Sequence, residues 1–289
     1  MKEKNIVISI VMNCYNGEKF LKEAIDSVFN QSYLNWEIIF YDNSSSDSSG
    51  DIAKSYGSKI KYYKSSKTTP LGEARNAAIK LATGNFISFL DCDDLYLPHK
   101  LESQVKLMEQ GNYGMSYGSA LIIDEQGNEV KESLVKNNSG FIFDKLLSHY
   151  EINMQSVMIR SAFLKENNLN FPTHFEYGPD YDLFMELASR CEIGVVKDPI
   201  VKTRIHSGAL SKKTYHRVHV ELGETLSRIL ARDPRIKEMY PKEVSKALDK
   251  LKFYESINFV NNKDLVSARN IIKKLAFKRF EYALIFILL

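Results

Sequence analysis

The sequence predicts an α/β fold in which a mostly parallel sheet carries helices on both faces and is followed by a helical extension. Over about the first hundred residues, short and nearly continuous apolar runs alternate with segments of helical spacing, which favours right-handed βαβ units. Polar clusters follow several of the apolar runs, and the pattern from residue 212 onward is helical throughout. We therefore expect a domain over residues 1–211 and an extension over 212–289.

The first strand is predicted over Ile6–Met12, which is rich in β-branched residues, and it ends at the turn formers Asn13–Gly17. Trp36–Tyr41 predicts the second strand. An alanine-rich helix is predicted over residues 71–83, and Gly84 follows it in the position that commonly closes a helix. Further strands are predicted at residues 60–63, 85–90, 113–123, 155–160 and 201–206, and further helices at residues 20–29, 98–110, 141–149 and from 180.

Three carboxylates, Asp91, Asp93 and Asp94, directly follow the fourth predicted strand. Like charges at this spacing repel unless a cation lies among them, and oxygen ligands suit Mg²⁺ or Mn²⁺. Ligands of parallel sheets collect at the carboxyl ends of the strands, where Tyr15–Asn16 and Asp42–Asn43 also lie. This coincidence favours a functional site over the alternative, a solvated acidic loop.

The charge of the chain is unevenly distributed. The net charge of +3 is too small to suggest a nucleic-acid-binding protein. Residues 212–289, however, contain 17 Lys and Arg against nine Asp and Glu. A basic helical segment is typical of contact with anionic lipid, so we expect this extension to touch the inner leaflet. The alternative is a solvated bundle or the arm of a homo-oligomer.

The cysteines and the apolar segments indicate a cytoplasmic location. Cys14, Cys92 and Cys191 have no metal-binding spacing, which favours a reducing compartment. The first residues do not form a signal peptide, and no stretch approaches the roughly 20 apolar residues that span a bilayer. The apolar run over residues 282–289 is too short to span, and three interpretations of it stay open: a buried last helix, an end that dips into the membrane, or the start of a segment absent from this chain. We expect a cytoplasmic protein, peripheral on the inner face of the membrane through its basic extension.

Four motifs together resemble a known family. Val11–Asn16, Tyr41–Asp47, Gly72–Asn76 and Leu90–Asp94 are similar, in order and spacing, to glycosyltransferase family 2. The resemblance covers residue 5 to about residue 211. It implies a GT-A fold for this domain and an inverting, metal-dependent transfer from a nucleotide-sugar donor.

The resemblance implies donor-binding roles for five residues. Tyr15 and Asn16 should line the nucleotide pocket. Asp42 should accept the N3–H of uracil, which selects a UDP-sugar, although Asp42 is also a common turn former. Arg75 should reach the diphosphate or the neighbouring acids, and Asp91 should lie near the ribose.

The resemblance also implies a bound Mn²⁺ or Mg²⁺ that bridges the two phosphates and neutralises charge on the leaving diphosphate. Asp93 is expected to be the main ligand and Asp91 a further ligand, and His206 is expected to supply a second contact to the metal or to a phosphate. Asp94 is expected to be structural, for instance by capping the helix after Pro98 or by pairing with Arg75. For His206 the alternative is a structural histidine.

Asp180 is the expected catalytic base, because an inverting transfer needs a carboxylate that takes the proton of the acceptor hydroxyl. Relatives usually have Glu-Asp here, whereas this chain has Pro179-Asp180, so the acceptor site is expected to differ. Asp182 is the alternative base. Nearby aromatic side chains are expected to stack on an acceptor sugar or else to fill the core: Phe171, Phe175, Tyr177 and Tyr181.

The predicted function is transfer of a sugar to a hydroxyl of a lipid-linked or cell-surface oligosaccharide. Two alternatives stay open. A sugar nucleotidyltransferase would need a glycine-rich loop with a basic residue after the first strand, and Asn13–Gly17 is no such loop. A nucleotide-sugar-binding scaffold without turnover is suggested by Pro179.

Overall fold

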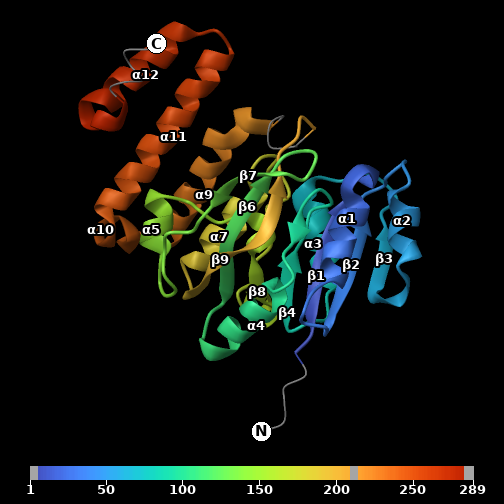
Figure 1. Cartoon of the computed structure of the whole chain (residues 1–289). Coiled ribbons are helices and arrows are strands. Elements are labelled where there is room, and N and C mark those ends of the chain that lie inside the picture. The colour runs from blue at the N-terminus through green and yellow to red at the C-terminus, as the bar shows by residue number, and fades with distance from the viewer. Residues whose placement is uncertain (1–5, 209–213, 283–289) are drawn as a thin grey trace. The chain divides into compact units, whose positions relative to one another are not determined.

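The computed structural model describes residues 6–208 and 214–282 (Figure 1). The chain divides into two compact units, formed by the described residues of Met1–Ile142 with Glu151–Ala209 and of Phe143–Tyr150 with Leu210–Leu289. The boundary thus falls close to residue 211, but the segment Phe143–Tyr150 belongs to the helical unit.

Within the described residues, the strands of the first unit form one nine-stranded sheet of order β3-β2-β1-β4-β8-β6-β9-β5, with β7 paired to β6. The strands are β1 (Ile8–Cys14), β2 (Trp36–Asp42), β3 (Ile60–Lys64), β4 (Phe86–Phe89), β5 (Leu95–Tyr96), β6 (Met115–Ile123), β7 (Glu129–Ser133), β8 (Met158–Arg160) and β9 (Ile193–Arg204).

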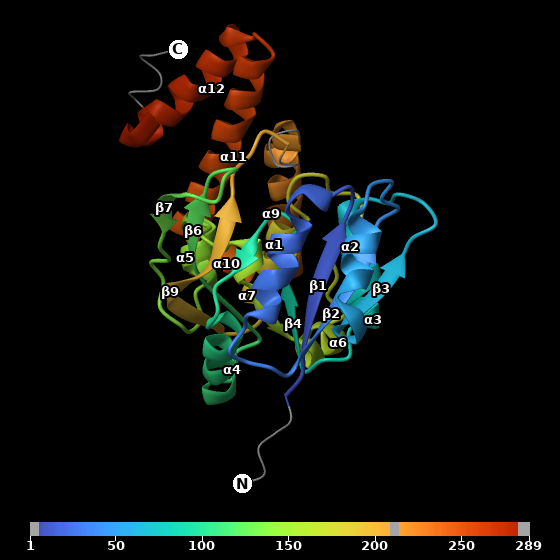
Figure 2. The same cartoon turned by 45° about the vertical axis from the view of Figure 1, so that its right-hand side comes forward.

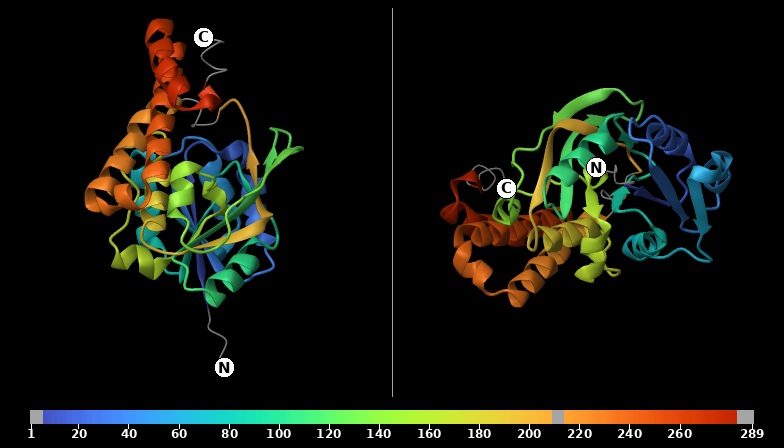
Figure 3. Two further views of the ribbon diagram at one scale, coloured as in Figure 1. Left: turned by 90° about the vertical axis from the view of Figure 1, so that its left-hand side faces the viewer. Right: turned by 90° about the horizontal axis from the view of Figure 1, so that it is seen from below.

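Strands β1 to β4 are mutually parallel, as the alternating pattern predicts. Helices α1 (Glu18–Phe29) and α2 (Ser49–Ser55) lie on one face of these strands and α3 (Leu71–Leu81) on the other (Figure 3). The strands of such a sheet are buried on both faces, which is why their sequences are nearly continuously apolar. This half of the sheet fixes where the carboxyl ends of the strands lie.

The other half of the sheet is mixed. β8 is antiparallel to β4 and to β6, whereas β6 and β9 run parallel, side by side (Figure 2). Two predicted strands have other limits. Residues 154–156 form a 3₁₀ turn, so β8 begins at Met158, and β9 begins eight residues before the predicted strand at 201. The early part of β9 was not predicted, because β9 is irregular there: its pairing with β6 shifts register beside Pro199.

The remaining helices of the first unit are α4 (Lys100–Gln110), α6 (Ser161–Glu166) and α7 (Pro179–Ala188). The interpretation of Gly84 as a helix-closing glycine is wrong, because α3 ends at Leu81. A Cβ at position 84 would lie 2.6 Å from the backbone nitrogen of Ser9. Glycine is therefore required by the close approach of the chain to β1.

The second unit is helical, as predicted for the C-terminal part. Its helices are α5 (Phe143–Ser148), α9 (Val218–Arg232), α10 (Arg235–Met239), α11 (Pro241–Asn261) and α12 (Leu265–Lys278). α11 and α12 pack side by side (Figures 1 and 2). Lys278, at the end of α12, bonds to Ser245 and Asp249 near the start of α11, so the pair is antiparallel. Within residues 6–208 and 214–282, no helix has both the length and the apolarity to cross a membrane.

Replacing Gly72 should destabilise the first unit. A Cβ at this position would lie 2.2 Å from the carbonyl oxygen of Pro172, so Gly72→Ala forces the backbone apart and should cost about 1–3 kcal/mol. Urea unfolding followed by circular dichroism measures this cost. The control is Gly223→Ala, inside α9, where the new Cβ makes an ordinary 3.6 Å contact with Leu251. Because alanine favours a helix more than glycine does, this substitution should be neutral or stabilising. An unchanged urea midpoint for Gly72→Ala would contradict the close approach.

Candidate active site

The polar clusters singled out in the sequence lie at one edge of the sheet. Cys14 pairs with Asp42 at the ends of β1 and β2, and Val11 pairs with Phe89 at the end of β4. Because these three strands are parallel, the loops that follow them meet at their carboxyl ends. The residues of these loops include Tyr15, Asn16, Asp42, Asp91 and Asp93.

The loops after β1 and β2 are fastened to each other by hydrogen bonds between side chains and backbone. The backbone nitrogen of Asn16 donates to Oγ of Ser45 at 3.0 Å, and the nitrogen of Ser46 donates to Oδ1 of Asn16 at 2.9 Å. Asn16 and Ser44 adopt left-handed backbone conformations, with φ of 53° and 69°. Asn16 therefore shapes the loop, while the side chain of Tyr15 is 58% exposed.

Asp42 is fully buried and its carboxylate already has partners. It accepts a hydrogen bond from the backbone nitrogen of Ser45 at 2.7 Å and one from the hydroxyl of Tyr62 at 2.6 Å, and Nζ of Lys64 lies 3.8 Å away. Burial, together with the bond to Asp42, raises the pKa of Tyr62. Asp42 thus anchors the loop after β2, and its contact with uracil stays a prediction.

Asp91 is held from two sides. Arg75, buried on α3, donates to its carboxylate at 3.2 Å, and Nε2 of Gln155 donates to Oδ2 at 2.6 Å. The backbone nitrogen of Asp91 in turn donates to Oε1 of Gln155 at 2.8 Å. The predicted approach of Arg75 to the acids is therefore present. Gln155 is not predictable from the sequence, since a glutamine ahead of a short strand belongs to no recognisable motif.

Asp93 and His206 come together from residues far apart in the chain. Nε2 of His206 lies 2.9 Å from Oδ2 of Asp93, and the Asp93 side chain is 35% exposed. Burial and then the charge of Asp91 raise the pKa of Asp93. A carboxylate oxygen beside an imidazole nitrogen is a donor pair that suits Mn²⁺. The residues therefore fit the predicted ion, although no group of three metal-binding side chains is present in the described part of the chain.

Asp94 has neither of the predicted roles. Its carboxylate accepts the backbone nitrogen of Arg204 at 2.7 Å, so it neither caps a helix nor pairs with Arg75. The buried Arg204 side chain donates to the carbonyl of Asp93 at 3.0 Å, to that of Glu125 at 3.0 Å and to the carboxylate of Glu23 at 2.8 Å. Arg204 thereby ties the acidic loop to α1, β9 and the turn between β6 and β7.

Asp180 is the second residue of α7, at the positive end of the helix dipole. Burial raises the pKa of Asp180, while the nearby Arg75 lowers it and Asp91 raises it. Asp180 thus lies close enough to Arg75 and Asp91 for their charges to shift its pKa. Pro179 occupies the first helical position, where proline is favoured. Asp182 is only 3% exposed.

The loop before α7 is anchored to α3. Nδ2 of Asn76 donates to the carbonyl of Phe171 at 2.8 Å, and the nitrogen of Phe171 donates to Oδ1 of Asn76 at 2.9 Å. Phe171 and Phe175 are buried, so of the two predicted positions the one in the core is confirmed for them and the stacking on a sugar is not. Tyr177 and Tyr181 are partly exposed and stay candidates for acceptor contact.

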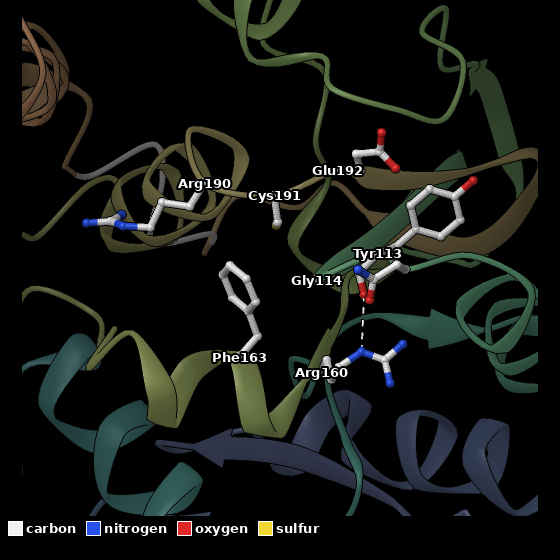
Figure 4. Close-up of a pocket in the computed structure, with 8 residues that line it drawn as sticks. Tyr113, Gly114, Arg160, Phe163, Arg190, Cys191 and Glu192 are labelled. Atoms are coloured by element: carbon white, nitrogen blue, oxygen red, sulfur yellow. Dashed lines mark hydrogen bonds between the residues drawn. The ribbon is translucent and has the colours of Figure 1, made fainter.

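A separate cavity of about 310 Å³ lies near the start of β6 and β9 (Figure 4). Arg160 lines it and donates to the carbonyl of Tyr113 at 3.3 Å. Arg160 pairs with Phe86, the first residue of β4, so it lies at the edge of the sheet opposite to Asp91. This cavity is therefore not part of the candidate active site.

The family profile described as Glycosyl transferase family 2 matches residues 9–166. The chain belongs to glycosyltransferase family 2. An Escherichia coli relative, UDP-Glc:alpha-D-GlcNAc-diphosphoundecaprenol beta-1,3-glucosyltransferase WfgD, is 30% identical over 232 residues, which are 78% of this chain and 89% of WfgD.

An uncharacterised glycosyltransferase of Rickettsia bellii is 32% identical over 200 residues, which are 68% of this chain. That relative is much longer, and the chain spans only 29% of it. The chain likewise spans only 44% of the length of a relative from Rickettsia felis and 33% of that of a relative from Rickettsia conorii.

Solved structures of low sequence identity share the fold of this chain. S. aureus TarS, residues 1–349 in complex with UDP-GlcNAc, matches with a TM-score of 0.65 and 18% identity, over 94% of this chain and 92% of that one. The mannosyltransferase PcManGT of Pyrobaculum calidifontis, in complex with GDP-Man and Mn²⁺, matches with a TM-score of 0.64 and 16% identity, over 97% and 83% of the two chains. The chain has the GT-A fold expected from its motifs.

Replacing Arg204 by lysine should destabilise the first unit. Lysine keeps the charge but lacks the planar fork that serves several acceptors at once, so buried carbonyls lose their donors, at a cost of about 1–3 kcal/mol. Thermal and urea unfolding measure the change. The control is Arg235→Lys, whose side chain is 78% exposed and pairs with Asp233, and which should leave the midpoint unchanged. Equal midpoints for the two variants would show that Arg204 does not hold the site together.

Proposed function

We propose that the protein is an inverting, metal-dependent glycosyltransferase that moves a sugar from a UDP-sugar to a hydroxyl of a lipid-linked or cell-surface oligosaccharide. The observation that carries the proposal is the gathering of Arg75, Asp91, Asp93 and His206 at one edge of the sheet, with Asp180 within their electrostatic reach. These are the groups needed at the two ends of a glycosyl transfer, the leaving diphosphate and the attacking hydroxyl.

On the donor side, Tyr15 and the loop shaped by Asn16 line the nucleotide pocket, and Asp42 selects uracil. Asp91, which Arg75 and Gln155 hold in place, would lie near the ribose. Arg75 compensates the charge of Asp91 and contributes positive potential to the diphosphate. The TarS complex with UDP-GlcNAc supports a UDP-sugar donor.

Asp93 and His206 would hold the divalent ion. A bound Mn²⁺ or Mg²⁺ supplies Lewis-acid neutralisation of the charge that develops on the nucleoside diphosphate. The PcManGT complex with Mn²⁺ supports this choice of ion. The remaining ligands would come from the diphosphate oxygens, since Asp93 and His206 form a pair rather than a complete set of ligands.

On the acceptor side, Asp180 takes the proton of the attacking hydroxyl as the new bond to the sugar forms and the bond to UDP breaks. Burial raises the pKa of Asp180 and so strengthens it as a base, and Arg75 opposes this shift and favours the ionised form. Tyr177 and Tyr181 flank this position and would contact the acceptor. Asp182 is only 3% exposed, whereas Asp180 is partly exposed, so Asp180 is the base that an acceptor hydroxyl can reach more readily.

The name of WfgD, whose acceptor is a diphosphoundecaprenol-linked sugar, supports a lipid-linked acceptor. An enzyme with such an acceptor works beside a membrane. We accordingly propose that the protein is cytoplasmic and peripheral on the inner face of the cell membrane, and that the basic helical extension makes the contact.

Asp180→Asn should abolish transfer while it preserves donor binding. Without the base, transfer should be slower by about 10²–10⁴-fold. Donor binding should persist, because the amide has nearly the shape of the carboxylate. Transfer is measured as UDP release that depends on an acceptor, and donor binding is measured by calorimetry with UDP. Asp198→Asn, an exposed residue on β9, is the control and should retain full activity. If Asp180→Asn still transfers and Asp182→Asn does not, the base is Asp182.

Asp93→Ala and His206→Ala should weaken Mn²⁺ binding in the presence of UDP, and Asp93→Ala should abolish donor hydrolysis. A ligand that binds the folded state raises its stability with the logarithm of concentration over Kd, so Mn²⁺ with UDP should raise the melting temperature of the wild type and not of the variants. The exposed Asp51→Ala is the control. Full activity in EDTA would overturn the role of the metal.

A further inference from the structure

The outer face of α12 is apolar and basic at once. Its inner face is formed by Ala268, Ile272 and Leu275, which are buried. Phe277, near its end, is 85% exposed, and Phe280, just beyond it, is 93% exposed. Among the described residues these are the two most exposed large apolar side chains, so they add nothing to the core that the structure describes.

Basic side chains surround the two phenylalanines. Lys273 and Lys274 are exposed on the same helix, one turn before Phe277. Residues 241–282 contain ten Lys and Arg against five Asp and Glu. A cavity of about 500 Å³ in the same unit is lined by Lys242 and Lys246 together with Glu243, and by Arg279, which pairs with Asp249 at 2.6 Å. The two lysines bring further basic side chains to the start of α11.

Exposed aromatic rings among ammonium groups are complementary to the interface of an anionic bilayer. The rings lie among the upper acyl chains, and the cations face the lipid phosphates. In an interface with a protein partner, by contrast, exposed aromatic side chains are more commonly surrounded by residues other than lysine, because the cores of such interfaces are depleted of lysine. The sequence that follows, residues 283–289, consists of seven consecutive apolar residues and continues the apolar character of this end.

We propose that the outer face of α12, with Phe277 and Phe280 as inserted side chains and Lys273 and Lys274 as charge contacts, docks the protein on an anionic lipid surface. The inference rests on the proposed function for its purpose, since a lipid-linked acceptor lies at such a surface. The docking itself requires neither donor nor catalysis.

The experiment is sedimentation of the full chain with vesicles, without donor or metal. Binding is expected to vesicles that contain phosphatidylglycerol at about a third of the lipid, and not to phosphatidylcholine alone, and it should weaken as salt rises. Reversal of two charges, Lys273→Glu with Lys274→Glu, should weaken binding by about thirtyfold or more, given the contribution of each cation at a charged surface. The matched control is Lys106→Glu with Lys165→Glu, two exposed lysines of the first unit, which should bind as the wild type does.

Insertion is tested separately from charge. The chain has one tryptophan, Trp36, which is buried, so a second at position 277 is readily distinguished. The emission of Phe277→Trp should shift to the blue on anionic vesicles, whereas that of Leu34→Trp, at a 70% exposed site of the first unit, should not. Phe277→Ser with Phe280→Ser should lose most of the binding and keep the melting temperature.

Three outcomes would overturn the proposal: equal binding to both kinds of vesicle, unchanged binding of the serine variant, or a dimer in solution that the serine substitutions dissociate. The last result would identify a second copy of the chain as the occupant of this face. Because vesicle binding is measured without turnover, a protein that binds vesicles but transfers no sugar would overturn the proposed function and leave this inference standing.

Discussion

The compensation of three neighbouring carboxylates is the constraint on which the candidate site depends. Asp91, Asp93 and Asp94 lie within four residues, and each has a different partner: Arg75 from α3, His206 from beyond β9, and the backbone nitrogen of Arg204 from β9. Burial and the charges of the neighbouring acids still raise the pKa of Asp93 and of Asp94, so these partners offset the repulsion only in part. The loop is therefore stable only when α3 and β9 are both in place.

This arrangement makes the site a product of the whole first unit. Gln155 orients Asp91 from the turn before β8, and Arg204 connects the acidic loop with Glu23 on α1. Asn76 holds the backbone at Phe171 and so fixes the loop that leads to Asp180. A site of this kind is preorganised, because its reacting groups are held by other groups that do not react.

The helical unit follows different physical rules. Its helices pack through apolar side chains, and ion pairs such as Lys278–Asp249 join α12 to α11. On the outer face of α12, Phe277 and Lys274 are exposed. In the first unit, the buried side chains of Arg75 and Arg204 compensate acids. In the second unit, Lys273 and Lys274 of α12 stay exposed, where they can meet an anionic partner. The uneven charge seen in the sequence thus corresponds to two separate uses of basic residues.

The sequence by itself determined the fold class, the family, the parallel half of the sheet, the helical extension and the acids of the candidate site. These follow from local periodicity and from motifs whose residues are close in the chain. Only the tertiary structure decided the partners: that Gln155 clamps Asp91, that Asp94 serves Arg204, that Asp42 is buried against Tyr62, and that Phe171 and Phe175 fill the core. The physical reason is that these contacts join residues up to about a hundred positions apart, and no local pattern records which distant side chain will meet a buried charge.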